Sequence, residues 1–189
     1  EFYHTNIEKL TVLYFGSFNP FHIGHAAVAK YVASLPWVEE LCFVLSPKNP
    51  LKESNTLQDA HERWEDLQRV VKKLQKECNA NFTASDIEFH LEPPLYTYNT
   101  LESLSRQFPD KHFALLMGGD NINILHKWYH GEEILQKYPV LVYPREGVDT
   151  EAVCNERGAI FIDAPQVDVS STQIRNMQNA GEDASHLRY

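Results

Sequence analysis

Two histidines lie three residues apart in a short segment that also holds glycine and proline. The segment reads Gly16, Ser17, Phe18, Asn19, Pro20, Phe21, His22, Ile23, Gly24 and His25. Gly16 permits a sharp turn and a close approach of a ligand to the backbone. Gly24 and His25 fall where a helix is expected to begin, so free backbone N–H groups would face a ligand there. Imidazoles in that place would donate hydrogen bonds to phosphate oxygens during phosphoryl or nucleotidyl transfer.

The histidine pair has two other interpretations. A histidine near a helix start is commonly a cap or a surface residue, and a histidine pair can also bind a metal ion. The metal interpretation lacks a cysteine or a third histidine at ligand spacing. From His22 and His25 alone, a cap or surface role and a phosphate-binding role stay equally open.

A second polar cluster occurs near the C-terminus, in the run from Val169 to Arg175. Ser170, Ser171 and Thr172 stand where a helix is expected to begin and would offer hydroxyls and N–H groups to an anion. Arg175 follows one turn later and can form a fork of hydrogen bonds to phosphate oxygens. By itself this cluster also fits an ordinary helix cap with an exposed arginine nearby.

The elements that must position both clusters are strands and helices in alternation. Short apolar runs predict strands at residues 10–15, 41–45, 112–117, 140–143 and 159–162, with one or two more within 82–89. Apolar residues at steps of three and four, or capping signals, predict helices at residues 25–35, 57–78, 100–108, 132–137 and 170–180. This alternation indicates a parallel sheet covered on both faces, with ligands bound beyond the carboxyl ends of its strands. Both polar clusters follow such strands.

The composition is that of one globular domain. The chain has 189 residues, of which 43% are hydrophobic, and a net charge of -9. This charge argues against nucleic acid and anionic membranes as partners but leaves room for one positive nucleotide pocket. Cys42, Cys78 and Cys154 form no CxxC pair, so we expect reduced thiols in a cytoplasmic protein. We find no signal-peptide order and no apolar run long enough to span a bilayer.

The two clusters together resemble a known superfamily. GSFNPFHIGH is similar to the signature of the nucleotidyltransferases whose hallmark is HxGH, and VSSTQIR resembles their ISSTxIR motif. A P-loop and a GxGxxG fingerprint are both missing from the sequence. The resemblance implies a Rossmann-like, doubly wound α/β fold with a mostly parallel sheet and helices on both faces. It implies catalytic roles for His22, His25 and Arg175. It implies ATP binding by Gly16, Ser17, Phe18, Gly24, Gly118, Asp120, Ser171 and Thr172.

The middle of the chain narrows the resemblance to bacterial nicotinate-mononucleotide adenylyltransferases. Residues 94–101 (PLYTYNTL) resemble their SYTxxTL segment, 118–121 (GGDN) resemble a GxD turn, and 125–135 resemble their tryptophan-containing stretch. The resemblance implies a mononucleotide site made of Asn19, Lys52, Thr97, Trp128 and Tyr129. In that site the indole of Trp128 would stack on the pyridine ring, with Thr97 and the Tyr129 backbone at the carboxylate. Without the resemblance, Trp128 could equally be a core or interface residue, and Lys52 a solvated loop residue.

The sequence departs from the family pattern in three places. Residues 46–52 read SPKNPLK rather than a PPHK-like string, and Arg145 is followed by Glu146 where the family has proline. The family usually continues into a further helix, so we expect a single domain over residues 1–189 that lacks this helix.

The expected reaction is transfer of AMP from ATP to nicotinate mononucleotide, with release of pyrophosphate. Mg²⁺ is expected to bind mainly through the ATP phosphates, without a dedicated protein metal site. Alternatives are an enzyme that uses nicotinamide mononucleotide or phosphopantetheine, a non-catalytic nucleotide sensor, and a structural scaffold. A homo-oligomer stays open.

Overall fold

The computed structural model describes residues 8–47 and 57–189. Strands and helices alternate along the chain. They are β1 (Leu10–Gly16), α1 (Ile23–Ala33), β2 (Val38–Leu45), α2 (Leu57–Glu77), β3 (Phe82–Ser85), the 3-10 turn η1 (Ile87–His90), α3 (Thr97–Gln107), β4 (His112–Gly118), α4 (Gly119–Ile122), the 3-10 turn η2 (Leu125–Lys127), α5 (Gly131–Lys137), β5 (Val140–Tyr143), α6 (Thr150–Arg157), β6 (Ile160–Phe161) and α7 (Ser171–Asn179).

In the described part of the chain, six strands form one parallel sheet in the order β3-β2-β1-β4-β5-β6. This order confirms the predicted doubly wound fold. The direction of winding reverses between β1 and β4, where the connections leave to opposite sides and open a crevice at the carboxyl ends of the strands. The turn after β1 therefore begins at the point where such folds bind ligands.

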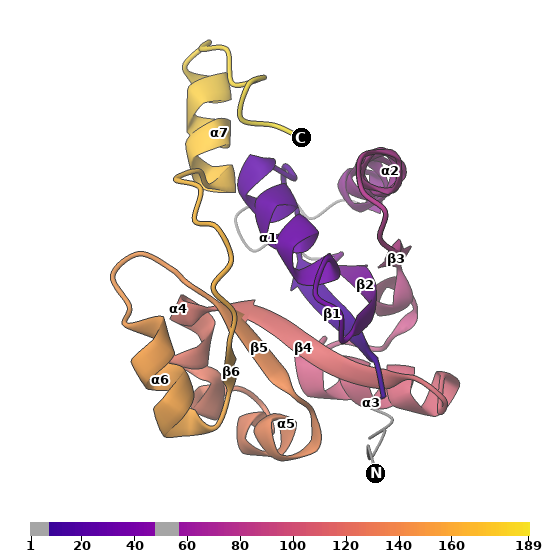
Figure 1. Cartoon of the computed structure of the whole chain (residues 1–189). Coiled ribbons are helices and arrows are strands. Elements are labelled where there is room, and N and C mark those ends of the chain that lie inside the picture. The colour runs from indigo at the N-terminus through magenta and orange to yellow at the C-terminus, as the bar shows by residue number, and fades with distance from the viewer. Residues whose placement is uncertain (1–7, 48–56) are drawn as a thin grey trace.

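Helices cover both faces of the sheet (Figure 1). On one face, Val12 and Tyr14 of β1 pack with α1 and with a stripe of α2 that includes Leu67 and Leu74. On the other face, Leu13 packs with residues of α3, α4, α5 and α6. Because β1 is buried from both sides, its sequence is a continuous apolar run rather than an alternating one.

Several elements differ from the sequence predictions. The 82–89 segment is one strand followed by η1, and α3 begins at Thr97 rather than at residue 100. Helices α4 and α6 were not predicted. Only Thr150 and Cys154 of α6 are buried, so the helix shows no apolar stripe. The sequence features that mark this helix are its caps. At its start the Asp149 side chain accepts from the backbone N–H of Ala152, and at its end Gly158 adopts a φ of 77°.

Helix α7 lies beside α1 at the edge of the fold (Figure 1). The Ser170 side chain caps it by accepting from the backbone N–H of Gln173 at 3.0 Å. Its apolar face rests on a small cluster formed by Val169, Ile174 and Ala184. The predicted helix at 170–180 is thus present as Ser171–Asn179.

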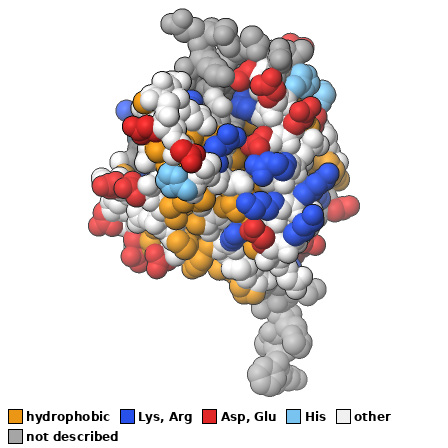
Figure 2. Space-filling view, turned by 90° about the horizontal axis from the view of Figure 1, so that it is seen from above, with side chains coloured by type: hydrophobic (Ala, Val, Ile, Leu, Met, Phe, Trp, Pro, Cys, Tyr) orange, Lys and Arg blue, Asp and Glu red, His pale blue; other side chains and the backbone are white. Residues whose placement is uncertain are grey.

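Basic side chains gather on one side of this acidic protein. Figure 2 looks onto the side that carries α1, α2 and α7, where lysine and arginine side chains cluster. Those that line a shallow groove along α2 are Arg69, Lys72, Lys73 and Lys76. None of the helices in residues 8–47 and 57–189 combines the length and apolarity that a membrane span requires.

Candidate active site

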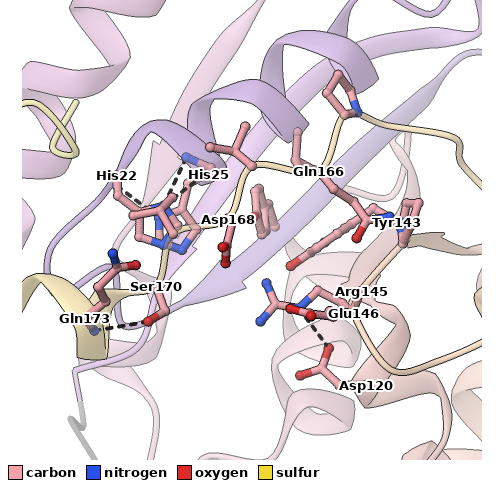
Figure 3. A pocket seen from close by; sticks show the side chains of 17 residues that line it. His22, His25, Asp120, Tyr143, Arg145, Glu146, Gln166, Asp168, Ser170 and Gln173 are labelled. Atoms are coloured by element: carbon pink, nitrogen blue, oxygen red, sulfur yellow. Dashed lines mark hydrogen bonds and ion pairs between the residues drawn. The ribbon is translucent and has the colours of Figure 1, made fainter.

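A pocket of about 450 Å³ opens at the carboxyl ends of β1, β4 and β5. The start of α1 forms one wall, and the connection from β6 to α7 closes a side. Figure 3 shows His22 and His25 on one wall, Arg145 and Asp120 across from them, and Asp168 between. The pocket is lined by Tyr14, His22, Gly24, His25, Val28, Asp120, Tyr143, Pro144, Arg145, Glu146, Pro165, Gln166, Val167, Asp168, Val169, Ser170 and Gln173.

The two histidines cap α1 and face the pocket at the same time. Nδ1 of His22 accepts from the backbone N–H groups of Gly24 at 3.1 Å and His25 at 3.3 Å. Nδ1 of His25 accepts from the backbone N–H of His22 at 3.1 Å. The rings stack with their centroids 3.6 Å apart. In the neutral imidazoles the proton therefore resides on Nε2, because Nδ1 of each ring is an acceptor.

Burial keeps both imidazoles neutral. It lowers the pKa of His22 from 6.5 to about 4, with a further contribution from the positive charge of Arg145. It also lowers the pKa of His25 well below its ordinary value, with added effects of His22 and Arg145. Near neutral pH each ring thus presents an uncharged Nε2–H donor.

Gly24 is required by the packing of the histidine pair. A Cβ atom at this position would lie 2.9 Å from Cε1 of His22 and 3.1 Å from Cγ1 of Val169. Both neighbours are ring or branched atoms in the pocket wall, so a side chain there would displace the imidazole.

The opposite wall carries a cation and two phenols. Nε of Arg145 lies 3.7 Å from Oδ1 of Asp120. A Cβ atom on Gly118 would lie 2.6 Å from that carboxylate oxygen, so the glycine makes room for it. Burial, followed by the nearby phenol of Tyr143, raises the pKa of Tyr14, and burial raises that of Tyr143. This wall therefore combines a cation, its carboxylate partner and two neutral phenols.

The structure joins the two polar clusters, which lie at opposite ends of the chain. Oγ of Ser171 donates to the carbonyl of Pro20 at 2.9 Å, across 151 residues. The Arg175 guanidinium donates to the carbonyl of Asn19 and, at 3.0 Å, to Oγ1 of Thr172. Helix α7 is thereby fastened to the turn that precedes His22.

The remaining residues of the first turn surround this junction. The Phe18 backbone has a φ of 44°, in the left-handed region, and its ring would lie 3.0 Å from a Cβ on Gly16. Nδ2 of Asn19 is buried and has no hydrogen-bond partner among the described residues. The carbonyl of Ser17 accepts a hydrogen bond from Nη1 of Arg63 in α2 at 2.8 Å. Of the predicted ATP-binding residues, Gly24 and Asp120 line the pocket, whereas Gly16, Ser17, Phe18, Gly118, Ser171 and Thr172 lie outside its lining.

The predicted pyridine-ring residues form a separate group. Thr97 is the first residue of α3, and the preceding Tyr96 stacks on Tyr129 at 4.4 Å between ring centroids. Trp128 is half-buried and packs against the core cluster that contains Leu13 and Leu125, while Tyr129 is 45% exposed. This group does not line the 450 Å³ pocket. The predicted residue Lys52 lies outside the described residues.

Several pocket residues were not singled out from the sequence. Tyr14, Tyr143 and Asp168 line the pocket, and Arg63 lies behind it. The rule that ligands bind beyond strand ends pointed to the segments that hold Tyr143 and Asp168, without selecting either residue. Arg63 belongs to a helix face, and nothing in the local sequence separates it from other arginines.

The fold, the stacked histidine pair and the bonds that fasten α7 to the first turn together define a nucleotidyltransferase. The family model described as cytidylyltransferase-like matches residues 13–177. A protein of Flavobacterium psychrophilum is 43% identical over 170 residues, which are 88% of this chain and 86% of that protein. One of Porphyromonas gingivalis is 39% identical and covers 95% of this chain and 88% of its own length. Both carry the name "Probable nicotinate-nucleotide adenylyltransferase". The chain belongs to the nicotinate-nucleotide adenylyltransferase family.

Solved structures have the same fold. The nicotinic acid mononucleotide adenylyltransferase of Plasmodium falciparum, complexed with APC, superimposes with a TM-score of 0.77 at 21% identity, over 94% of this chain and 88% of that chain. A putative nicotinate-nucleotide adenylyltransferase from Vibrio parahaemolyticus superimposes with a TM-score of 0.67 at 23% identity, over 95% and 86%.

Proposed function

We propose that this protein transfers the adenylyl group of ATP to nicotinate mononucleotide, giving deamido-NAD and pyrophosphate. The observation that carries the proposal is the stacked His22–His25 pair, whose two Nε2–H donors face a pocket that also holds Arg145. The relatives' names supply the acceptor. We further propose that the chain acts as a single domain, and its free cysteines support a cytoplasmic location.

The chemistry needs positioning and charge stabilisation rather than a covalent enzyme intermediate. A phosphate oxygen of the acceptor forms a bond to the α-phosphorus of ATP, and the bond from that phosphorus to the bridging oxygen breaks. The electron pair leaves with pyrophosphate. Neutral His22 and His25 would donate to the oxygens of the α-phosphate, where charge is redistributed.

Positive charge would come from Arg145, which lines the pocket, and from Arg175, which holds the first turn from α7. Arg175, with Ser171 and Thr172, would hold the leaving pyrophosphate at the start of α7. To do so, its guanidinium must release or share the Asn19 carbonyl that it now contacts. On the other wall, Asp120 would accept hydrogen bonds from the ATP nucleoside.

Nucleotidyltransferases of this kind use a metal ion together with ATP, and we propose Mg²⁺. The described residues include no group of three histidine, cysteine or carboxylate side chains at ligand spacing. Phosphate oxygens and water would hold this ion, which is the usual way that Mg²⁺ binds with nucleotides. When bound, the ion would neutralise charge on the triphosphate.

For the acceptor, we propose that the base lies near Trp128, Thr97 and Tyr129, with the phosphate toward Asn19 and Lys52. The unpartnered Nδ2 of Asn19 supports this direction, because a buried donor without a partner is rare unless a ligand satisfies it. The half-buried indole of Trp128 supports a flat aromatic base.

The test is pyrophosphate release with ATP and Mg²⁺ in three parallel reactions, containing nicotinate mononucleotide, nicotinamide mononucleotide or phosphopantetheine. Mass spectrometry identifies the product, and omission of acceptor or Mg²⁺ gives the controls. We expect the nicotinate reaction to be fastest. Preference for another acceptor would contradict the acceptor assignment alone. Absence of release with all three would contradict the enzyme itself and favour a nucleotide sensor.

A further inference from the structure

Arg63 of α2 is a buried cation behind the pocket, with only 6% of its surface exposed. Its guanidinium reaches the carboxyl ends of two neighbouring strands. Nη1 donates to the carbonyls of Ser17 and Ser46, each at 2.8 Å. Nη2 donates to the carbonyl of Pro47 at 2.8 Å, and Nε to Oδ2 of Asp59 at 3.2 Å.

These contacts join two segments that diverge after the sheet. Ser17 lies in the turn between β1 and α1, and Ser46 and Pro47 follow β2. The strands themselves are in register up to Gly16 and Leu45, and the backbone N–H of Ser46 still donates to the carbonyl of Gly16 at 2.9 Å. Beyond that bond, Arg63 is the cation that holds the two segments together. The planar fork of a guanidinium suits three converging carbonyls, whereas an ammonium group is a single point of charge.

The turn held by Arg63 carries Asn19 and leads into His22, which are two of the groups proposed to contact the substrates. Ser17 precedes Phe18, whose backbone is in the left-handed region, and Phe18 precedes Asn19 with its unpartnered Nδ2. The Arg63 bond to the Ser17 carbonyl and the Arg175 bond to the Asn19 carbonyl hold the backbone on both sides of Phe18, and with it the direction in which the Asn19 side chain leaves the turn. The same turn leads into His22 and the cap of α1.

We infer that Arg63 is a positioning residue, which fixes the first turn against the segment after β2 so that Asn19 is pre-oriented for the acceptor phosphate. The inference rests on the proposed function. Arg63 acts through Ser17, Ser46 and Pro47 rather than on the substrate, because these carbonyls and Asp59 already engage four of its five N–H groups. It is distinct from Arg145, which lines the pocket, and from Arg175, which contacts the carbonyl of Asn19.

The experiment compares wild type with Arg63→Met, Arg63→Lys and a control, Lys72→Met. Lys72 is an exposed residue of the same helix, so its replacement removes a basic side chain without touching the turn. Each protein is assayed for kcat and for KM of nicotinate mononucleotide at saturating ATP. Calorimetry gives the Kd of ATP alone, and circular dichroism gives the melting temperature, so that all assays run well below it.

We expect Arg63→Met to lower kcat/KM for the mononucleotide by about 100-fold, as a misplaced binding group does, and Arg63→Lys to lower it by about ten-fold. The Kd of ATP should rise far less than kcat/KM falls in both variants, even though Arg63 contacts Ser17 of the expected ATP-binding turn, and Lys72→Met should behave as wild type. If Arg63→Met does not fold, Arg63→Lys carries the same test.

Two results would overturn the inference while leaving the enzyme assignment intact. One is an unchanged kcat/KM in a folded Arg63 variant. The other is a parallel loss of ATP binding and acceptor use, which would indicate general destabilisation rather than positioning. A wild-type protein that makes no dinucleotide would instead overturn the proposed function, and the inference with it.

Discussion

The neutral state of the histidine pair predicts that the protein loses stability in mild acid. The pKa of His22 falls from 6.5 to about 4 on folding because the ring is buried. Below pH 6.5 the unfolded chain therefore binds a proton that the folded protein does not, so the free energy of unfolding falls as the pH falls. The loss continues down to about pH 4, where the folded protein also takes up the proton. His25, whose pKa is lowered in the same direction, adds to the effect.

The size of this loss in unfolding free energy follows from the pKa shift of His22. Each pKa unit corresponds to about 1.4 kcal/mol, so His22 contributes a loss of about 2 kcal/mol between pH 6.5 and pH 5. The full loss is about 3 kcal/mol when the pH reaches 4. His22 is only 5% exposed, so solvent screens little of this loss.

Urea denaturation at a series of pH values from 7.5 to 4.5 measures this loss. The informative variant is His22→Asn, because asparagine accepts the same backbone N–H groups at a helix start but does not titrate. We expect its unfolding free energy to depend less steeply on pH than that of wild type. His186→Asn, at an exposed position, should follow wild type. Parallel curves for wild type and His22→Asn would refute the claim that His22 is buried as a neutral ring.

Three further predictions concern activity. His25→Ala should lower kcat by about 100- to 1,000-fold, as loss of one transition-state donor does, while calorimetry shows little change in ATP affinity; unchanged turnover would remove His25 from the mechanism. Gly24→Ala should lower kcat by about ten-fold or more with an unaltered circular dichroism spectrum, because the added Cβ displaces the His22 ring; wild-type kinetics would show that the ring position is unimportant. Chelation by EDTA should abolish pyrophosphate release, and excess Mg²⁺ should restore it; activity that persists in EDTA would argue against a metal–ATP substrate.

The central strands of the sheet were predictable because they are buried on both faces. The apolar runs at 10–15, 112–117 and 140–143 correspond to β1, β4 and β5 within a residue or so at each end. Helix α2 was predictable from its stripe of apolar residues. Helix α6 was not predictable, because Thr150 and Cys154 are its only buried residues and form no apolar stripe. The capping residues Asp149 and Gly158 mark its two ends but are too weak a signal alone.

The site was predictable as far as its chemistry is local in sequence. His22 and His25 share one turn of helix, so their spacing alone brings them together, and the Ser170 cap has a short-range signal. Arg63 contacts Ser17 from 46 residues away, and Asp168 reaches the pocket through a connection without regular structure. Such partners depend on how helices and loops are laid across the sheet, which periodicity does not specify.

The bonds from Ser171 and Arg175 to the carbonyls of Pro20 and Asn19 also have a meaning for biosynthesis. They span 151 and 156 residues, so the first turn leaves the ribosome long before α7 exists. A nascent chain can assemble β1, β2 and their helices before Ser171 and Arg175 exist to hold the first turn. The first turn therefore gains its contacts with α7 only in the finished molecule, and a ligand that bound both segments would favour the fully docked chain over any partly assembled one.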